Sequence, residues 1–135
     1  MKIKYRIPTD HIVLRNLTMP KNINANGNIF GGWIISQIDI GGAILAKEIS
    51  GGKVTTVCMK NVTFIEPILS GDLLDCYGRC IKIGNTSITI NIQIWIKKLC
   101  SKPFGKYYCA TKAQVVYVAI DRYGNKRNLL PMSII

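Results

Sequence analysis

The sequence predicts an α+β fold in which one long helix packs against an antiparallel β-sheet. Residues 32–49 carry apolar side chains at helical spacing, and Ser50, Gly51 and Gly52 follow as a stop signal. After residue 52 the hydrophobic period changes from about 3.6 to about 2. The connections between the later segments are short, as in hairpins, so we expect their strands to pair in antiparallel fashion.

The elements follow in order along the chain. Residues 10–20 read as a strand that Pro20 closes, and residues 21–31 form a loop rich in Asn and Gly. After the helix, the strands expected from the alternation span residues 53–67, 71–84, 86–98 and 107–121, with a turn at 122–125. In 86–98 every second residue is Ile, which predicts one packed face with Ile88, Ile90, Ile92, Ile94 and Ile96, and a more polar face with Thr89, Asn91, Gln93 and Trp95.

The chain has the length of one domain. Its 135 residues predict a single domain over 1–135, with 1–9 and 132–135 loose. The apolar runs are interrupted well before the ~20 residues that a membrane span needs, so no membrane insertion is expected. The N-terminus shows no signal-peptide pattern, which predicts a cytoplasmic location.

The net charge of +11 is open to several interpretations. Nucleic acid, an acidic membrane surface and a polyanionic small ligand would each suit a basic protein. The heavy use of Ile, Lys and Asn is also expected from an AT-rich genome, which would give the charge no function. A specific ligand has to be argued from the positions of individual residues.

Asp39 stands out inside the predicted helix. At about 100° per residue it shares a stripe with small and apolar residues such as Gly42, Ala43 and Ala46, whereas Gln37 and Glu48 are expected on an opposite, solvated face. A carboxylate removed from water is costly unless it is hydrogen-bonded or protonated. The small neighbours allow a ligand or a second helix to approach. An acid–base role and a structural ion pair both remain open from this pattern alone.

Metal and disulfide chemistry are not indicated. The five cysteines are an odd number without paired metal spacing, and His11 is the only histidine. We expect the cysteines to be small buried hydrophobic residues in a reducing compartment, and we expect no metal site.

Four segments together resemble a known family. They are MPKNINANGNIFGGWIISQIDIGGAILAKE, VTTVCMKNVTFIEPILSGDLLDCYGRC, SITINIQIWIKK and VAIDRYGNKRNLLP, and the likeness covers about residues 11–131. They resemble the YciA-type acyl-CoA thioesterases of the hot-dog fold. The resemblance implies a long central helix wrapped by a five- or six-stranded antiparallel sheet, and hydrolysis of acyl-CoA to free CoA and a carboxylic acid. It also implies dimers that share active sites, assembly as trimers of dimers, and no cofactor, because CoA belongs to the substrate.

The resemblance assigns roles to individual residues. It places the catalytic carboxylate at Asp39 and a catalytic partner at Asn24. Asn28 stands where the family usually has Asp, in a loop implied to contact the substrate; Asn can accept the same turn hydrogen bonds if the Asp only shapes the loop. Phe64 is a candidate for the acyl tunnel. The turn with Thr86 and Ser87 lies near CoA in the family, and Lys97 and Lys98 are candidates for binding the CoA phosphates.

The residue types suit thioester hydrolysis. Asp39 can act as general base toward water or attack directly to give a mixed anhydride, and the sequence leaves both routes open. Gly31 and Gly32, at the start of the helix, offer unsatisfied backbone N–H groups as an oxyanion site.

Three other functions compete with thioester hydrolysis. A hot-dog dehydratase needs a histidine near the helix, whereas His11 lies in the first predicted strand. A non-catalytic acyl-CoA-binding scaffold is motivated by Asn28. A nucleic-acid-binding domain is motivated by the charge, but the strands do not interleave aromatic with basic residues as RNA-binding sheets do.

Overall fold

The computed structural model describes residues 10–129. The predicted loose segments 1–9 and 132–135 lie outside the described residues. Along the chain the elements are β1 (His11–Leu17), the 3₁₀ turn η1 (Pro20–Asn22), α1 (Gly31–Ser50), β2 (Val54–Phe64), β3 (Leu73–Ile83), β4 (Ser87–Lys97) and β5 (Tyr107–Ala119). Each predicted helix and strand is present, with ends that differ by a few residues.

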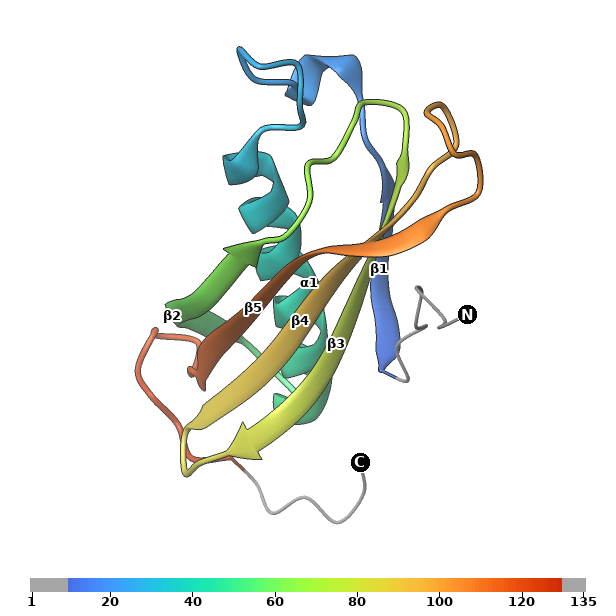
Figure 1. The fold of residues 1–135 in the computed structure, drawn as a ribbon. Coiled ribbons are helices and arrows are strands. Elements are labelled where there is room, and N and C mark those ends of the chain that lie inside the picture. Colours follow the sequence, from blue (N-terminus) through green and yellow to red (C-terminus); the bar gives the residue numbers. More distant parts are fainter. Residues whose placement is uncertain (1–9, 130–135) are drawn as a thin grey trace.

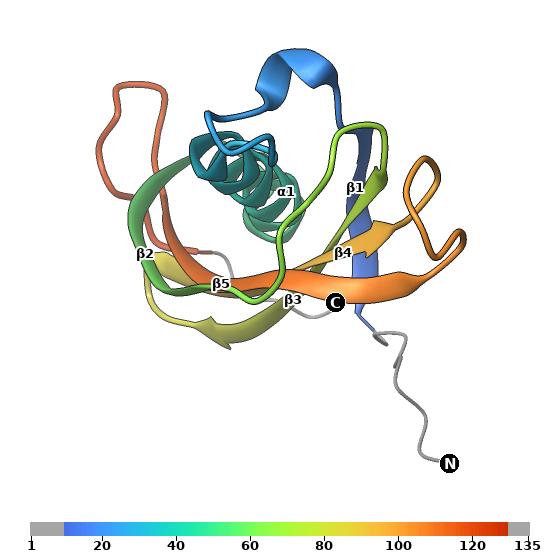
Figure 2. The same ribbon diagram turned by 45° about the horizontal axis from the view of Figure 1, so that its top comes forward.

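One helix lies in the concave side of a five-stranded antiparallel sheet, as predicted (Figures 1 and 2). The strand order is β1-β3-β4-β5-β2, so β1 and β2 are the two edges. The sheet curves around α1, which Figure 2 shows nearly end-on. This arrangement buries one face of the helix against all five strands and leaves the other face of the sheet turned away from the helix.

The short connection after β2 is not a hairpin, which corrects the sequence-based expectation. β2 pairs with β5, whereas β3 pairs with β1 and β4, so residues 65–72 carry the chain from the edge strand β2 past β5 and β4 to β3. On the way Ile68 is buried, and its carbonyl accepts a hydrogen bond of 2.7 Å from the Ile29 N–H. The connection is therefore held against the loop that precedes α1. The length of residues 65–72 alone did not distinguish this connection from a hairpin turn.

The core lies between the helix and β4. The five alternate isoleucines of β4 are buried, as predicted, and they pack with Ile38 and Ala46 of α1. The opposite face is less polar than expected, because Trp95 is also buried. Its ring lies 5.2 Å from that of Tyr107, centroid to centroid, and a register shift between Ile94 and Trp95 accompanies it.

The helix ends as predicted but its solvated face is shifted. Gly51 takes a left-handed conformation (φ 72°), and its N–H bonds to the Lys47 carbonyl. Gln37, expected on the wet face, is buried, because β1 covers that side of the helix and Asn16 Nδ2 donates to Gln37 Oε1 at 3.2 Å. Glu48 is exposed, as expected.

The five cysteines are free, but they are not all buried. Cys76 is buried against α1, and desolvation raises the pKa of its thiol to about 12. Cys58 and Cys100 are exposed, which the small-hydrophobe interpretation did not predict. Cys58 lies on the edge strand β2, and Cys100 lies on the connection between β4 and β5.

Two consecutive glycines let the helix approach the sheet. A Cβ added to Gly41 would lie 2.6 Å from the sulfur of Cys76 on β3. A Cβ added to Gly42 would collide with the hydroxyl of Tyr117 on β5. Real Cβ atoms do not approach other atoms so closely, so these positions exclude larger residues at the present spacing between helix and sheet.

We therefore expect Gly42→Ala to lower the free energy of unfolding by about 1–3 kcal/mol, because the methyl group overpacks against Tyr117. Urea unfolding at fixed protein concentration measures this loss. In a Tyr117→Phe background the same substitution should cost less, since the colliding hydroxyl is gone. An equal cost in both backgrounds would show that the hydroxyl contact does not set the spacing.

Candidate active site

Asp39 is held in place by two side chains from the sheet. Thr56 Oγ1, on β2, donates to Asp39 Oδ1 at 2.7 Å. The Tyr117 hydroxyl, on β5, donates to the backbone carbonyl of Asp39 at 2.7 Å and lies 3.2 Å from Oδ1. Thr56 and Tyr117 are register partners on neighbouring strands, so antiparallel pairing brings both to the same point of the helix.

The tyrosine acts as a fixed donor. Tyr117 is fully buried, and desolvation, together with the charge of Asp39, raises the pKa of its hydroxyl. The hydroxyl therefore stays protonated at neutral pH. The hydroxyls of Thr56 and Tyr117 both donate to Oδ1 of Asp39, and within residues 10–129 the other oxygen, Oδ2, accepts no hydrogen bond and can take a further partner.

Asp39 itself is only half-buried in the single protomer. The sequence predicts a carboxylate away from solvent, and the structure gives a carboxylate at the margin of the packed helix face. Neighbouring exposed apolar side chains include Ile40 on the helix and Val57, which is 54% exposed, on β2. This margin therefore combines an oriented acid with an apolar surface that water covers in the single protomer.

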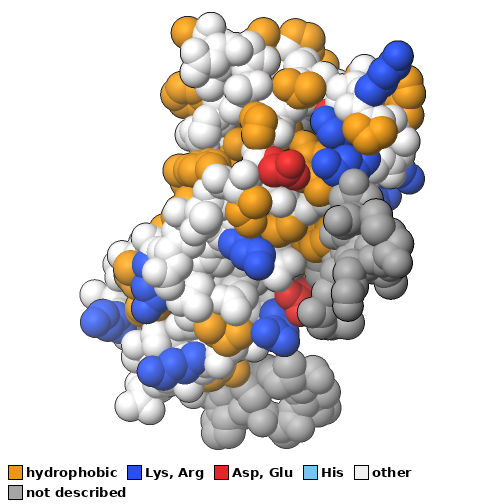
Figure 3. Space-filling model, viewed as in Figure 1, with side chains coloured by type: hydrophobic (Ala, Val, Ile, Leu, Met, Phe, Trp, Pro, Cys, Tyr) orange, Lys and Arg blue, Asp and Glu red, His pale blue; other side chains and the backbone are white. Residues whose placement is uncertain are grey.

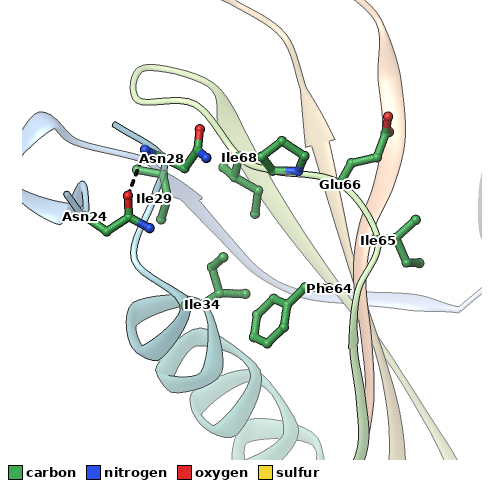
Figure 4. A pocket seen from close by; sticks show the side chains of 10 residues that line it. Asn24, Asn28, Ile29, Ile34, Phe64, Ile65, Glu66 and Ile68 are labelled. Atoms are coloured by element: carbon green, nitrogen blue, oxygen red, sulfur yellow. Dashed lines mark hydrogen bonds between the residues drawn. The ribbon is translucent and has the colours of Figure 1, made fainter. Parts of the chain in front are cut away.

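A pocket of about 310 Å³ lies at the N-terminal end of α1 (Figure 4). It brings together four of the residues predicted from the sequence: Asn24, Asn28, Gly31 and Phe64. The connection between β2 and β3 forms its other wall, with Glu66 and Ile68 among the side chains that Figure 4 labels. Phe64 is 51% exposed, so the pocket has an apolar but open side.

The loop that carries Asn24 is fixed by its own side chain. Asn24 Oδ1 accepts hydrogen bonds from the backbone N–H groups of Asn26 (2.9 Å) and Asn28 (3.1 Å), and the Asn24 N–H bonds to the Asn28 carbonyl at 2.7 Å. The Asn28 side chain makes no hydrogen bond within residues 10–129. The shape of the loop therefore does not depend on whether Asn or Asp stands at position 28.

The start of α1 offers backbone donors to this pocket. The Phe30 carbonyl accepts from the N–H groups of Trp33 (3.0 Å) and Ile34 (3.2 Å), and no side chain caps the helix. The N–H groups of Gly31 and Gly32 precede these bonds and remain available, at the positive end of the helix dipole. A Cβ on Gly31 would lie 3.6 Å from the Phe64 ring, in ordinary contact.

Asp39 does not reach this pocket in the same protomer. Eight residues of helix separate it from Gly31, a rise of about 12 Å. The lining residues of the pocket include Asn24 but not Asp39. One protomer therefore holds the predicted site residues at two separate places: the oriented carboxylate, and the pocket at the N-terminus of the helix.

The four predicted CoA contacts are also divided between two ends. Thr86 and Ser87 lie at the start of β4, and Lys97 and Lys98 lie at its end, about 34 Å away along the strand. The backbone carbonyl of Thr86 accepts a hydrogen bond of 2.9 Å from the Ala119 N–H, close to Tyr117 on β5. Lys98 Nζ lies 3.3 Å from Ser101 Oγ and over the ring of Tyr108, whereas Lys97 is exposed.

Sequence reasoning did not single out Thr56 or Tyr117. A signal exists for Tyr117, because the alternation in β5 turns its polar hydroxyl toward the helix, where it needs a partner. Thr56 is one of several threonines in a strand, and nothing local marks it.

In the described part of the chain, no three His, Cys, Asp or Glu residues lie together in a way that could hold a metal ion. No helix among residues 10–129 has the length and apolar character needed to cross a membrane.

Comparisons of this chain with known proteins show which family it belongs to. A model of the thioesterase superfamily matches residues 26–99. The acyl-CoA thioester hydrolase YciA of Salmonella typhimurium is 55% identical over 122 residues, which cover 90% of this chain and 92% of the relative. A hexameric thioesterase from Yersinia pestis has a TM-score of 0.88 at 52% identity, over 93% of this chain and 100% of that one.

A hexameric hot-dog-fold thioesterase of Campylobacter jejuni has a TM-score of 0.84 at 39% identity, over 88% of this chain and 90% of that one. The shared architecture is the single long helix wrapped by a five-stranded antiparallel sheet. The chain thus belongs to the thioesterase superfamily with its hot-dog fold, and within it to the YciA-type acyl-CoA thioester hydrolases.

Proposed function

We propose that Asp39 is the catalytic carboxylate with which this acyl-CoA thioester hydrolase cleaves its substrate to free CoA and a carboxylic acid. The observation that carries the proposal is the pair of donors, Thr56 and Tyr117, that orients Oδ1 and leaves Oδ2 unoccupied. A base works efficiently when its orientation is fixed before the substrate arrives.

In the general-base route, Oδ2 takes a proton from a water molecule while the water oxygen attacks the thioester carbonyl carbon. The carbon–sulfur bond then breaks, and the CoA thiolate leaves and is protonated. In the alternative route, Oδ2 attacks the carbonyl carbon itself, and water hydrolyses the resulting anhydride. The N–H groups of Gly31 and Gly32 stabilise the developing oxyanion in both routes, a contribution of about 3 kcal/mol by analogy with other enzymes.

The complete site needs two protomers. Within one protomer Asp39 and the Asn24 pocket are apart, and β2 is an edge strand with exposed apolar side chains such as Val57. Antiparallel pairing of two β2 edges covers these side chains and sets the Asp39 half of one protomer beside the Asn24 half of the other. Asn24 then orients the water or the thioester for the partner's carboxylate.

The same pairing gives the substrate contacts a common location. It turns the two ends of neighbouring sheets toward each other, so Thr86 and Ser87 of one protomer and Lys97 and Lys98 of the other can serve one CoA. Asn28 and Phe64 line the pocket for the acyl portion or the arm next to it. Three such dimers would form the hexamer described for the Yersinia pestis and Campylobacter jejuni thioesterases.

Several other expectations stay predictions from the sequence. They are the cytoplasmic location, the single domain over 1–135, and the absence of cofactor, metal and nucleic acid.

Asp39→Asn should lower kcat for butyryl-CoA and palmitoyl-CoA by about 100-fold or more, because the amide neither accepts the proton nor attacks the thioester. Release of free thiol measures the rate, and equilibrium binding of CoA shows that the site is intact. Glu48→Gln, an exposed carboxylate on the same helix, is the matched control and should keep the wild-type rate. Equal rates in the two variants would remove Asp39 from the mechanism. A wild type that binds acyl-CoA without thiol release would instead be a scaffold.

Thr56→Val should lower kcat about tenfold with little change in KM, since loss of one hydrogen bond to a carboxylate is worth about 1.5 kcal/mol. Thr55→Val is the control, because Thr55 lies next to Thr56 on β2 but points to the other face of the sheet. If Thr55→Val and Thr56→Val have the same kcat, orientation by Thr56 plays no part in the rate.

A further inference from the structure

The connection between β4 and β5 places large apolar side chains in solvent. We call residues 97–106, the last residue of β4 and this connection, the basic loop. Phe104 is 65% exposed and Leu99 is 46% exposed, and neither side chain belongs to the core between helix and sheet. Figures 1 and 2 both show the loop projecting from the sheet, away from α1. Packing within the protomer therefore does not explain these two apolar side chains.

The same segment concentrates positive charge. The basic loop contains four lysines and no Asp, Glu or Arg. Lys97 and Lys102 are exposed. Figure 3 shows Lys and hydrophobic side chains gathered together at the upper right, where Figure 1 places this loop. Part of the net charge of +11 thus lies next to an exposed aromatic ring.

A buried carboxylate holds the basic loop in this outward shape. Asp72 is fully buried, and its Oδ1 accepts hydrogen bonds from the N–H groups of Leu99 (3.0 Å) and Cys100 (3.1 Å). Its Oδ2 accepts a hydrogen bond of 2.9 Å from the Ser101 hydroxyl. Because the backbone is fixed from beneath, little backbone freedom is lost when a partner binds the loop.

Two of the lysines are anchored at the base of the loop by Tyr108. The Nζ atoms of Lys98 and Lys106 lie 5.4 and 5.1 Å from the centre of the Tyr108 ring. The Lys98 N–H also donates to the Lys106 carbonyl at 2.9 Å, which closes the loop. Lys102 and Phe104 lie between these anchors, so the closed loop presents a cation and an aromatic ring side by side.

We propose that the basic loop binds the surface of a membrane that contains anionic phospholipids. Lysines are attracted to anionic headgroups, and Phe and Leu side chains enter the boundary between headgroups and acyl chains. The long stem of a lysine lets its ammonium group stay among the headgroups while apolar neighbours reach deeper. The contact is peripheral and differs from a membrane span. It does not depend on the reaction proposed for Asp39.

A nucleic acid is the competing partner, because it is also a polyanion. Proteins that bind single strands stack several bases on aromatic rings, whereas the basic loop has one aromatic residue, Phe104. Arginine supplies the bidentate contacts to phosphates and base edges, and the loop has none. Leu99 adds apolar surface that a bilayer accepts and a base does not need. A membrane surface therefore suits both the charge and the apolar side chains.

Lys102→Glu and Phe104→Ser test the charge and the apolar tip separately, and they leave Lys97 and Lys98, proposed above for CoA, unchanged. The measurement is co-sedimentation with vesicles of equal parts phosphatidylglycerol and phosphatidylcholine. Wild type should bind these vesicles, should not bind vesicles of phosphatidylcholine alone, and should be released by high salt. Each variant should bind the mixed vesicles about tenfold more weakly, or less, because each removes one of the two attractions.

Lys126→Glu and Tyr123→Ser are the matched controls, because they make the same kinds of change at exposed residues in the turn after β5. This turn lies at the other end of β5, about 40 Å along the strand from the basic loop. Both controls should bind the mixed vesicles as wild type does. Circular dichroism and thiol release from butyryl-CoA, both retained in the two loop variants, would show that they are folded.

A wild type that does not bind the mixed vesicles would overturn the proposal, and so would either loop variant that binds as well as its control. A gel shift on RNA that Lys102→Glu abolishes, in a protein that does not bind vesicles, would assign the loop to nucleic acid. A fall in the sedimentation mass of Phe104→Ser would assign the loop to contacts between copies of the chain and would also overturn it. Turnover of the wild type is measured separately, so the proposed reaction and the proposed membrane contact can fail independently.

Discussion

The close approach of α1 to the sheet at Gly41 and Gly42 is the constraint on which the rest of the structure depends. Because Gly42 has no side chain, the Tyr117 hydroxyl reaches the backbone carbonyl and the carboxylate of Asp39. A buried tyrosine hydroxyl needs such a partner, and the helix needs a fixed rotation about its axis. One contact satisfies both requirements and sets where the carboxylate points.

This constraint links the core to the reaction. The buried isoleucines of β4 give the helix an apolar surface to pack on, but they would tolerate a helix turned or shifted slightly. The hydrogen bonds from Thr56 and Tyr117 select one position, since both strands are already held in register with each other. The packing thereby prepares an oriented acid at the margin of the protomer, next to an edge strand that has apolar side chains to cover. We regard the half-buried Asp39 as part of a site that a second protomer completes.

Much of the fold could be predicted because its signals are local. The helical spacing of residues 32–49, the glycine stop and the alternate isoleucines of β4 each depend on neighbours within a few residues. The strand order could not be predicted in this way. Residues 65–72 are short enough to be taken for a hairpin turn, whereas the pairing of β2 with β5 and of β3 with β1 and β4 shows that they cross the sheet. Gln37 and Trp95 are buried by elements distant in sequence, and periodicity within one element carries no information about those elements.

In the candidate site, too, the residues with a local sequence signal could be predicted, and those brought together only by strand pairing could not. Asp39 could be singled out because a carboxylate among small residues on a helix is anomalous in the sequence itself, and the glycines at the helix start are likewise local. Thr56 and Tyr117 meet Asp39 only through the pairing of β2 with β5. The resemblance implies Asn24 as a catalytic partner of Asp39 at a site shared between protomers, and the structure places the two residues apart in one protomer. That separation supports the proposed shared site.

Mixing two inactive variants, Asp39→Asn and Asn24→Ala, tests the shared site most directly. The proteins are denatured together in equal amounts and refolded, and thiol release from butyryl-CoA is compared with each variant refolded alone. If Asp39 works with Asn24 of the other protomer, half of the dimers are mixed, and each mixed dimer holds one intact site, so about a quarter of the wild-type activity returns. If the mixture is as inactive as its components, although mixed dimers have formed, the two residues act within one protomer and the account is wrong.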